Sequence, residues 1–394
     1  MKIIGEKLRM ARRISNKTIT KLSSEIGLTK QAISQFEYET AEPSGDSLMK
    51  IIRALNFPLQ IYTTPFQNQM TVKHTFFRAL ASASELERGS FIERANLITH
   101  IYEYLDEHLY LPELDLPQLN HTDILNRDEI ERLADDVRKY WGLGEKPIWN
   151  VVGLLEEKGV IVSTLSDSLL KIDGFTQVFK SKGNIKYCVV LEKEKRSMAR
   201  RNFSAAHELG HILLHTNLIS EEIEVDVIKH KEMERQANNF AACFLLPKEK
   251  FLKDLYAPTE YNCYVDLKQK WHISMTAMFL RARDLGVITE GEYIALIKKY
   301  NYRITRNNQN GERLEPYDDI IAVENPELFE SALEFLFENT KIDLYQFKDD
   351  LAAQGVAIGE DLMVSILSLD EKFFAKYHKE KTPIEFKVKN LILS

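Results

Sequence analysis

The order of hydrophobic and polar residues along the 394-residue chain predicts mainly helices. In several stretches apolar residues recur every three or four positions, a spacing that places them on one face of a helix. The clearest stretches are residues 128–141, 196–216, 231–246 and 326–340. Two short runs, VIVST at 160–164 and KYCVVLE at 186–192, are rich in β-branched and aromatic residues and predict strands. The expected fold class is therefore mainly α with a small β element (α+β).

Breaks in these patterns divide the chain into four segments. They are 1–64, with several short helices; 65–124, a helical linker region ending in a loop with two prolines; 125–295; and 296–394, mostly helical. In the first segment, Thr18 and Thr29 stand where N-caps are expected, and Gly27 lies where a tight turn needs a positive φ. Two short helices joined through a glycine turn are typical of a helix-turn-helix.

Composition and charge limit the cellular locations and the binding partners that we expect for the protein. Hydrophobic residues make up 44% of the chain, and no stretch approaches the length of a membrane span or resembles a secretory signal. The three cysteines lack CxxC spacing, so we expect no disulfide framework and a cytoplasmic location. Residues 1–64 carry a net charge of +4, whereas the whole chain carries −7. This asymmetry predicts that only the basic head meets a polyanion.

A candidate metal site lies in the run AAHELGHILLH, which contains His207, Glu208 and His211. Positions i and i+4 lie on one face of a helix, so both imidazoles can bind one zinc ion at about 2.0–2.1 Å. Glu208 lies beside the first histidine and can act as the general base toward the attacking water. His215 starts about 12 Å along the helix from His207. We therefore expect it to support the site or to pack, and not to bind the same ion.

The third zinc ligand is expected from the helix at 231–247. Glu234 begins a stripe of residues on one face, and the small Ala237 and Ala241 in that stripe let the two helices approach closely. Glu232 would point elsewhere. The competing carboxylates belong to a segment that is more typical of a solvated acidic loop: Glu221, Glu222, Glu224 and Asp226. We expect one Zn²⁺ per chain, bound by His207, His211 and Glu234.

The runs RNFSAAHELGHILLH (201–215) and ERQANNFAACFLLP (234–247) resemble the ImmA/IrrE family of zinc metallopeptidases, over residues 125–295. The resemblance implies a zincin-like HExxH peptidase domain with His207, His211 and Glu234 as metal ligands and Glu208 as catalytic base. It also implies regulatory proteolysis of a repressor or antitoxin-like protein, in stress response or mobile-element control.

The segment from Gly5 to Phe57 is similar to Xre/Cro/CI-type helix-turn-helix domains. The second helix of the motif is expected in the major groove of duplex DNA. The candidate contacts are Lys30, Gln31, Ser34 and Gln35 for base edges, and Arg12 and Arg13 for phosphates. Ile19 stands where such domains usually carry Gln, so one polar contact would be lost. Glu37 is expected to pair with an arginine of the first helix, such as Arg9.

The leading interpretation is thus a DNA-binding zinc metallopeptidase. One alternative is a helix-turn-helix regulator whose zinc domain senses a signal and cleaves little or nothing. Another is a toxin–antitoxin component that uses the head to bind an operator. A head that docks protein in place of DNA is also compatible with the sequence. Operators of such modules are commonly two-fold, so DNA binding is compatible with a homodimer.

Overall fold

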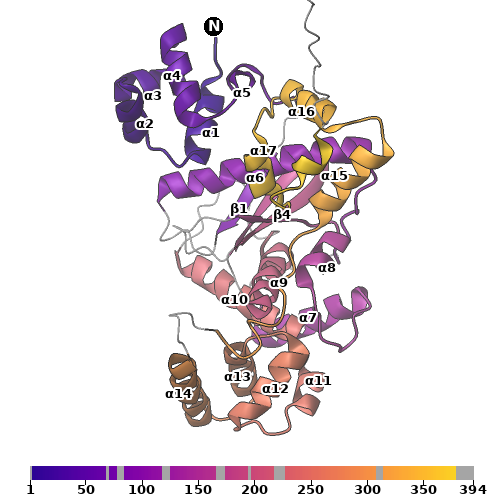
Figure 1. Ribbon diagram of the computed structural model, residues 1–394. Coiled ribbons are helices and arrows are strands. Elements are labelled where there is room, and N and C mark those ends of the chain that lie inside the picture. Colours follow the sequence, from indigo (N-terminus) through magenta and orange to yellow (C-terminus); the bar gives the residue numbers. More distant parts are fainter. Residues whose placement is uncertain are drawn as a thin grey trace, which may run out of the picture.

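The computed structural model describes residues 2–67, 71–77, 84–117, 125–165, 174–193, 197–216, 227–307 and 314–378. Within this part, a four-stranded sheet lies between two groups of helices (Figure 1). The strands, in chain order, are β1 (Thr71–Phe77), β2 (Ile161–Leu165), β3 (Gly174–Ser181) and β4 (Asn184–Glu192). Their order in the sheet is β1-β3-β4-β2, with β2 parallel to β4 and the other pairs antiparallel.

The head consists of α1 (Gly5–Ile14), α2 (Ile19–Ile26), α3 (Lys30–Glu37), α4 (Gly45–Leu55) and α5 (Leu59–Thr63). The expected caps are confirmed: Thr18 accepts a hydrogen bond from the Lys21 amide, and Thr29 accepts one from the Ala32 amide. Gly27 adopts the left-handed conformation at φ 67° and ends α2. These local features orient α2 and α3 as a helix-turn-helix.

Alternate residues of the central strands face two different hydrophobic cores, as the two-residue period of a strand requires. Phe175, Phe179 and Val190 face the core that contains α6 (Glu85–His108), whereas Val178 and Val189 face the core that contains α9 (Met198–His215). The first core also includes the head and helices α15 (Leu328–Asn339), α16 (Leu344–Ala353) and α17 (Glu360–Leu367). The sheet is therefore the partition between the head side and the metal side of the molecule.

Figure 1 shows α6 (Glu85–His108) crossing one face of the sheet while α9 (Met198–His215) and α10 (Val227–Leu245) lie beyond the other. The remaining helices on the α9 side are α7 (Arg127–Tyr140), α8 (Val151–Glu157), α11 (Lys248–Asp254), α12 (Tyr261–Trp271), α13 (Met275–Asp284) and α14 (Glu290–Asn307). No helix in the described ranges combines the length and apolarity needed to cross a membrane.

The expectation of a helical segment over 65–124 is correct for α6 but wrong for residues 71–77, which form β1. Strand β3 was not expected either. Both segments contain β-branched and aromatic residues, and they pair with each other across about a hundred positions of sequence. Helical periodicity is a local signal, and this long-range pairing overrides it. The predicted boundary at 295/296 falls inside α14, and the described C-terminal part is helical as expected.

Candidate metal centre

His207 and His211 project from one face of α9, a helix that is buried along almost its whole length. Their rings are one turn apart, with centroids 4.7 Å apart and Nε2 atoms 3.0 Å apart. Both side chains are buried against the apolar residues of the second core. The helix thus holds the two Nε2 atoms close together, and burial limits the movement of both rings.

Helix α10 brings a carboxylate to the same point because α9 and α10 pack very closely. A Cβ atom at Gly210 would lie only 3.1 Å from the Ala237 Cα atom, so the glycine permits the approach. One turn before Ala237, Glu234 places Oε1 at 3.2 Å from His211 Nε2 and Oε2 at 3.4 Å from His207 Nε2. The small residues at the crossing therefore determine where Glu234 lies.

The ligand atoms of His207, His211 and Glu234 all lie within 4.8 Å of one another. Ligands at about 2.0–2.1 Å from a tetrahedral zinc ion are about 3.3 Å apart. The contacts between these residues, at 3.0, 3.2 and 3.4 Å, are close to that separation. Burial raises the pKa of Glu234, but the two imidazoles beside it outweigh burial and leave the pKa well below its ordinary value. Two imidazoles and an ionised carboxylate fit one divalent ion.

Of the other carboxylates that the sequence offered, Glu232 lies in the described ranges and does not join this cluster. Glu232 pairs with Arg235 on the exposed side of α10, as its place in the sequence predicted. The remaining four, Glu221, Glu222, Glu224 and Asp226, lie outside the described residues.

A chain of hydrogen bonds behind His211 fixes its tautomer. The Gln236 side-chain amide donates to the Leu125 carbonyl at 2.7 Å, so its oxygen is left to accept from His215 Nε2 at 3.0 Å. Burial, with His211 nearby, lowers the pKa of His215 to about 3, so this ring is neutral and its Nδ1 is an acceptor. His211 Nδ1 must then donate to His215 Nδ1, which lies 2.9 Å away.

In the neutral His211 ring this assignment puts the lone pair on Nε2, which lies 3.0 Å from His207 Nε2 and 3.2 Å from Glu234 Oε1. A metal-binding histidine needs such a lone pair, and its other nitrogen usually donates to a supporting group. His215 therefore supports the site and does not join the cluster, as its place on the helix predicted. Gln236 was not predicted from the sequence, because its contact with His215 depends on how α9 and α10 pack.

Glu208 lies against β3. The Thr176 hydroxyl donates to Glu208 Oε2 at 2.7 Å, and a Cβ atom at Gly174 would lie 3.3 Å from Oε1. Gly174 and Thr176 are two positions apart, so they share the face of the sheet that looks toward α9. The sequence analysis missed Thr176 because it missed β3, although the run FTQVF was a strand signal. The carboxylate is thus oriented by a strand as well as by its helix.

The head presents α3 much as expected. Lys30 and Gln31, at its N-terminal end, are exposed, and Ser34 and Gln35 on the next turn are half-buried. This arrangement leaves the start of α3 accessible to a duplex.

The two arginines predicted to contact phosphate have other partners. Arg12 is buried, and its guanidinium donates to both carboxylate oxygens of Glu37, at 2.5 and 2.9 Å. The expectation that Glu37 pairs with α1 is confirmed, with Arg12 as the main partner and Arg9 Nε at 3.6 Å. Arg13 is half-buried and pairs with Glu93 of α6 at 3.2 Å. The prediction of a phosphate contact for Arg12 is wrong, because burial and its paired carboxylate keep it from solvent.

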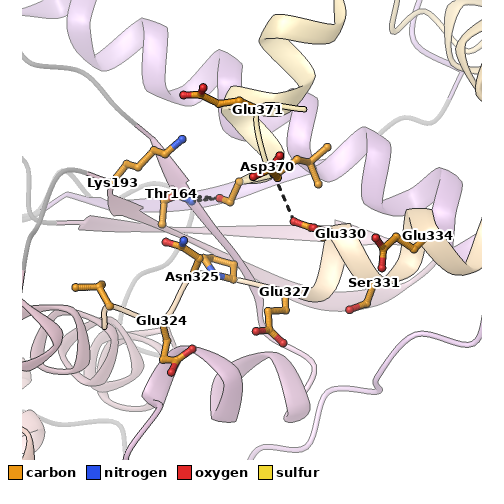
Figure 2. A pocket seen from close by; sticks show the side chains of 14 residues that line it. Thr164, Lys193, Glu324, Asn325, Glu327, Glu330, Ser331, Glu334, Asp370 and Glu371 are labelled. Carbon is orange, nitrogen blue, oxygen red and sulfur yellow. Dashed lines mark hydrogen bonds between the residues drawn. The ribbon is translucent and has the colours of Figure 1, made fainter. Parts of the chain in front are cut away.

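A cavity of about 690 Å³ lies elsewhere, between α15, the turn after α17 and the ends of β2 and β4 (Figure 2). Its lining is strongly acidic and includes Glu324, Glu327, Glu330, Glu334, Asp370 and Glu371, together with Lys193. In the described part of the chain these carboxylates form no group of three with ligand atoms as close as those of the cluster on α9 and α10. The acidic cavity is thus distinct from the candidate metal centre.

Comparison with known families agrees with both resemblances. Residues 155–283 match the model of the Peptidase M78 family, described as the IrrE N-terminal-like domain, and residues 8–62 match the Helix-turn-helix model. The first match includes His207, Glu208, His211 and Glu234. No curated protein gives a significant match to the chain. The two-part architecture expected from the sequence is confirmed, and it supports a DNA-binding regulator with an IrrE-like domain of the metallopeptidase type.

Proposed function

We propose that this chain is a zinc-dependent peptidase joined to a DNA-binding head, and that it cleaves a repressor-like or antitoxin-like protein as a regulatory step. The observation that most directly supports the proposal is the convergence of His207, His211 and Glu234 within the range of one ion. The match of residues 155–283 to a peptidase family supports the reaction class.

When bound, zinc supplies Lewis-acid polarisation of the scissile carbonyl and of the attacking water. His207, His211 and Glu234 would hold it, with His211 oriented through His215 and Gln236. Glu208 takes a proton from the attacking water and delivers it to the leaving amine. The hydrogen bond from Thr176 to Oε2 keeps the carboxylate in one orientation, so that it need not reorganise during proton transfer.

The test is cleavage of repressor-like proteins encoded beside this gene, followed by mass spectrometry of the fragments. Glu208→Gln should keep zinc and slow cleavage by at least about 100-fold, because the amide cannot accept the proton. Glu232→Gln, on the exposed side of α10, is the matched control and should cleave as the wild type does. If zinc-loaded wild type cleaves none of these proteins, the sensor interpretation replaces the peptidase.

We also propose that the head binds duplex DNA through the start of α3. The net charge of +4 and the exposure of Lys30 and Gln31 support this. Selection from random duplexes by the full chain should enrich a motif, and Gln31→Ala should relax preference at one position by about 1–3 kcal/mol. The absence of both enrichment and salt-dependent binding would identify the head as a protein-docking module.

A further inference from the structure

Strand β1 pairs along one edge of β3, the strand whose residues Gly174 and Thr176 lie against Glu208. Without β1, the sheet would end at β3, whose edge would be open to an extended polypeptide. The pairing is antiparallel and runs from Thr71 with Lys180 to Phe77 with Phe175. This segment comes from outside the matched peptidase region, 155–283, and the sequence did not predict it as a strand.

The register places the end of β1 beside the catalytic carboxylate. Phe76 pairs with Thr176, the residue whose hydroxyl holds Glu208. Phe77 pairs with Phe175, next to Gly174, which approaches the other Glu208 oxygen. Neighbouring strands are about 4.8 Å apart. The β1 backbone therefore runs within one strand spacing of the β3 residues that contact Glu208.

A peptidase must hold its substrate in extended form with the scissile bond near the general base. Pairing with an open strand edge provides main-chain hydrogen bonds for any sequence, which suits a polypeptide ligand. The β3 edge nearest Glu208 could supply those bonds, and in this structure β1 uses them. On the proposed peptidase function, β1 and a substrate compete for one edge.

The pairing of β1 is also less regular than that of its neighbour. Its register shifts between Val72 and His74, whereas β3 pairs with β4 without a shift. Such a bulge disrupts the ladder locally, and β1 pairs with one strand only, at the edge of the sheet. These features make β1 easier to displace than β3 and β4, which each pair with a strand on both sides.

We propose that residues 71–77 are an internal occupant of the peptide-binding edge of β3, and that a protein substrate reaches Glu208 by replacing them with an extended segment of its own. The inference rests on the proposed peptidase function and adds how the substrate binds and what limits its access.

Cross-linking tests the proposal in the full chain. Thr71→Cys/Lys180→Cys places two thiols on paired residues, at a Cα separation that a disulfide can span. Cys188, Cys243 and Cys263 are buried and will not compete. The matched control is Lys180→Cys/Ile185→Cys, which joins β3 to β4 and leaves β1 free to move.

The opposite test weakens the pairing of β1 with β3. In an antiparallel pair every second residue donates its amide to the partner, so Thr75→Pro/Phe76→Pro removes at least one hydrogen bond between the strands. With β-casein as an unfolded probe substrate, the proline variant should cleave about tenfold faster than wild type. Oxidation should slow the β1–β3 variant about tenfold, reversibly, and leave the β3–β4 control unchanged. Equal rates in the locked, loosened and wild-type chains would overturn the inference while leaving the peptidase intact.

A binding measurement separates the two proposals if no chain cleaves β-casein. Hydrogen exchange of the β3 amides is followed in the proline variant, with and without the synthetic peptide TVKHTFF. The prolines should speed exchange in β3, and the peptide should restore protection, even in a chain with no activity. That result supports the peptide-binding edge without the peptidase. Exchange that responds neither to the prolines nor to the peptide would refute the edge site.

Discussion

The head and the metal domain each bury a cluster of ionisable side chains, and the two clusters differ in their balance of donors and acceptors. In the head, Arg12 donates to both oxygens of Glu37, so donors meet acceptors within the protein. On α9 and α10, two imidazoles and the Glu234 carboxylate bring their ligand atoms within 4.8 Å of one another. The first cluster pairs a cation with an anion inside the protein, whereas the second gathers three groups of the kinds that bind a metal cation. Burial of charge alone thus does not mark a site.

The largest expected effect concerns the buried ion pair of the head, Arg12 with Glu37. Glu37→Ala leaves the buried Arg12 guanidinium without its carboxylate, which should destabilise the head by about 3–5 kcal/mol. Arg12→Met/Glu37→Leu removes both charges and should be far less destabilising, because the apolar pair fills similar space. Thermal unfolding of the full chain, followed through amide exchange in α1 and α3, measures both. Equal losses in the two variants would show that the unpaired charge of Arg12 is not the main cost in Glu37→Ala.

Changes in the cluster on α9 and α10 should alter the zinc affinity of the protein. Glu234→Ala removes a ligand, so zinc affinity should fall by more than the about 10–100-fold typical of losing a supporting residue. Metal content and competition with a chelator measure this. Glu232→Ala, on the same helix but paired with Arg235, should leave affinity unchanged. Unchanged affinity in Glu234→Ala would transfer the ligand role to another carboxylate.

A smaller effect on zinc affinity is expected for Gln236, which supports His211 through His215. Gln236→Leu removes the acceptor for His215, which frees that ring to change tautomer and to stop accepting from His211. Zinc affinity should fall about 10-fold. Asn238→Leu, whose side-chain amide only donates to the Glu234 backbone carbonyl, is the control on the same helix and should change affinity little. If both variants bind zinc as tightly as wild type, the hydrogen-bond chain does not set the ligand geometry.

Much of the candidate site was predictable because it depends on local spacing. The separation of His207 and His211 by four positions brings their rings together on any α-helix. The small Ala237 indicated that a second helix packs closely against the first, which brings Glu234 to the histidines. The supporting residues were less predictable. Thr176 reaches Glu208 across 32 residues of sequence, and Gln236 reaches His215 across 21. Contacts of this kind depend on how the elements pack, which periodicity does not describe.

The sequence by itself determined the helix caps at Thr18 and Thr29 and the faces of α9 and α10, since each rests on neighbours within a few positions. The sequence also carries the two family matches. Only the tertiary structure decided that residues 71–77 form a strand on β3, that Arg12 is withdrawn from the surface, and that the sheet separates the head side from the metal side. The physical reason is the same for all three. A strand edge or a buried ion pair gains its free energy from a distant partner, and that partner becomes available only when the chain has folded.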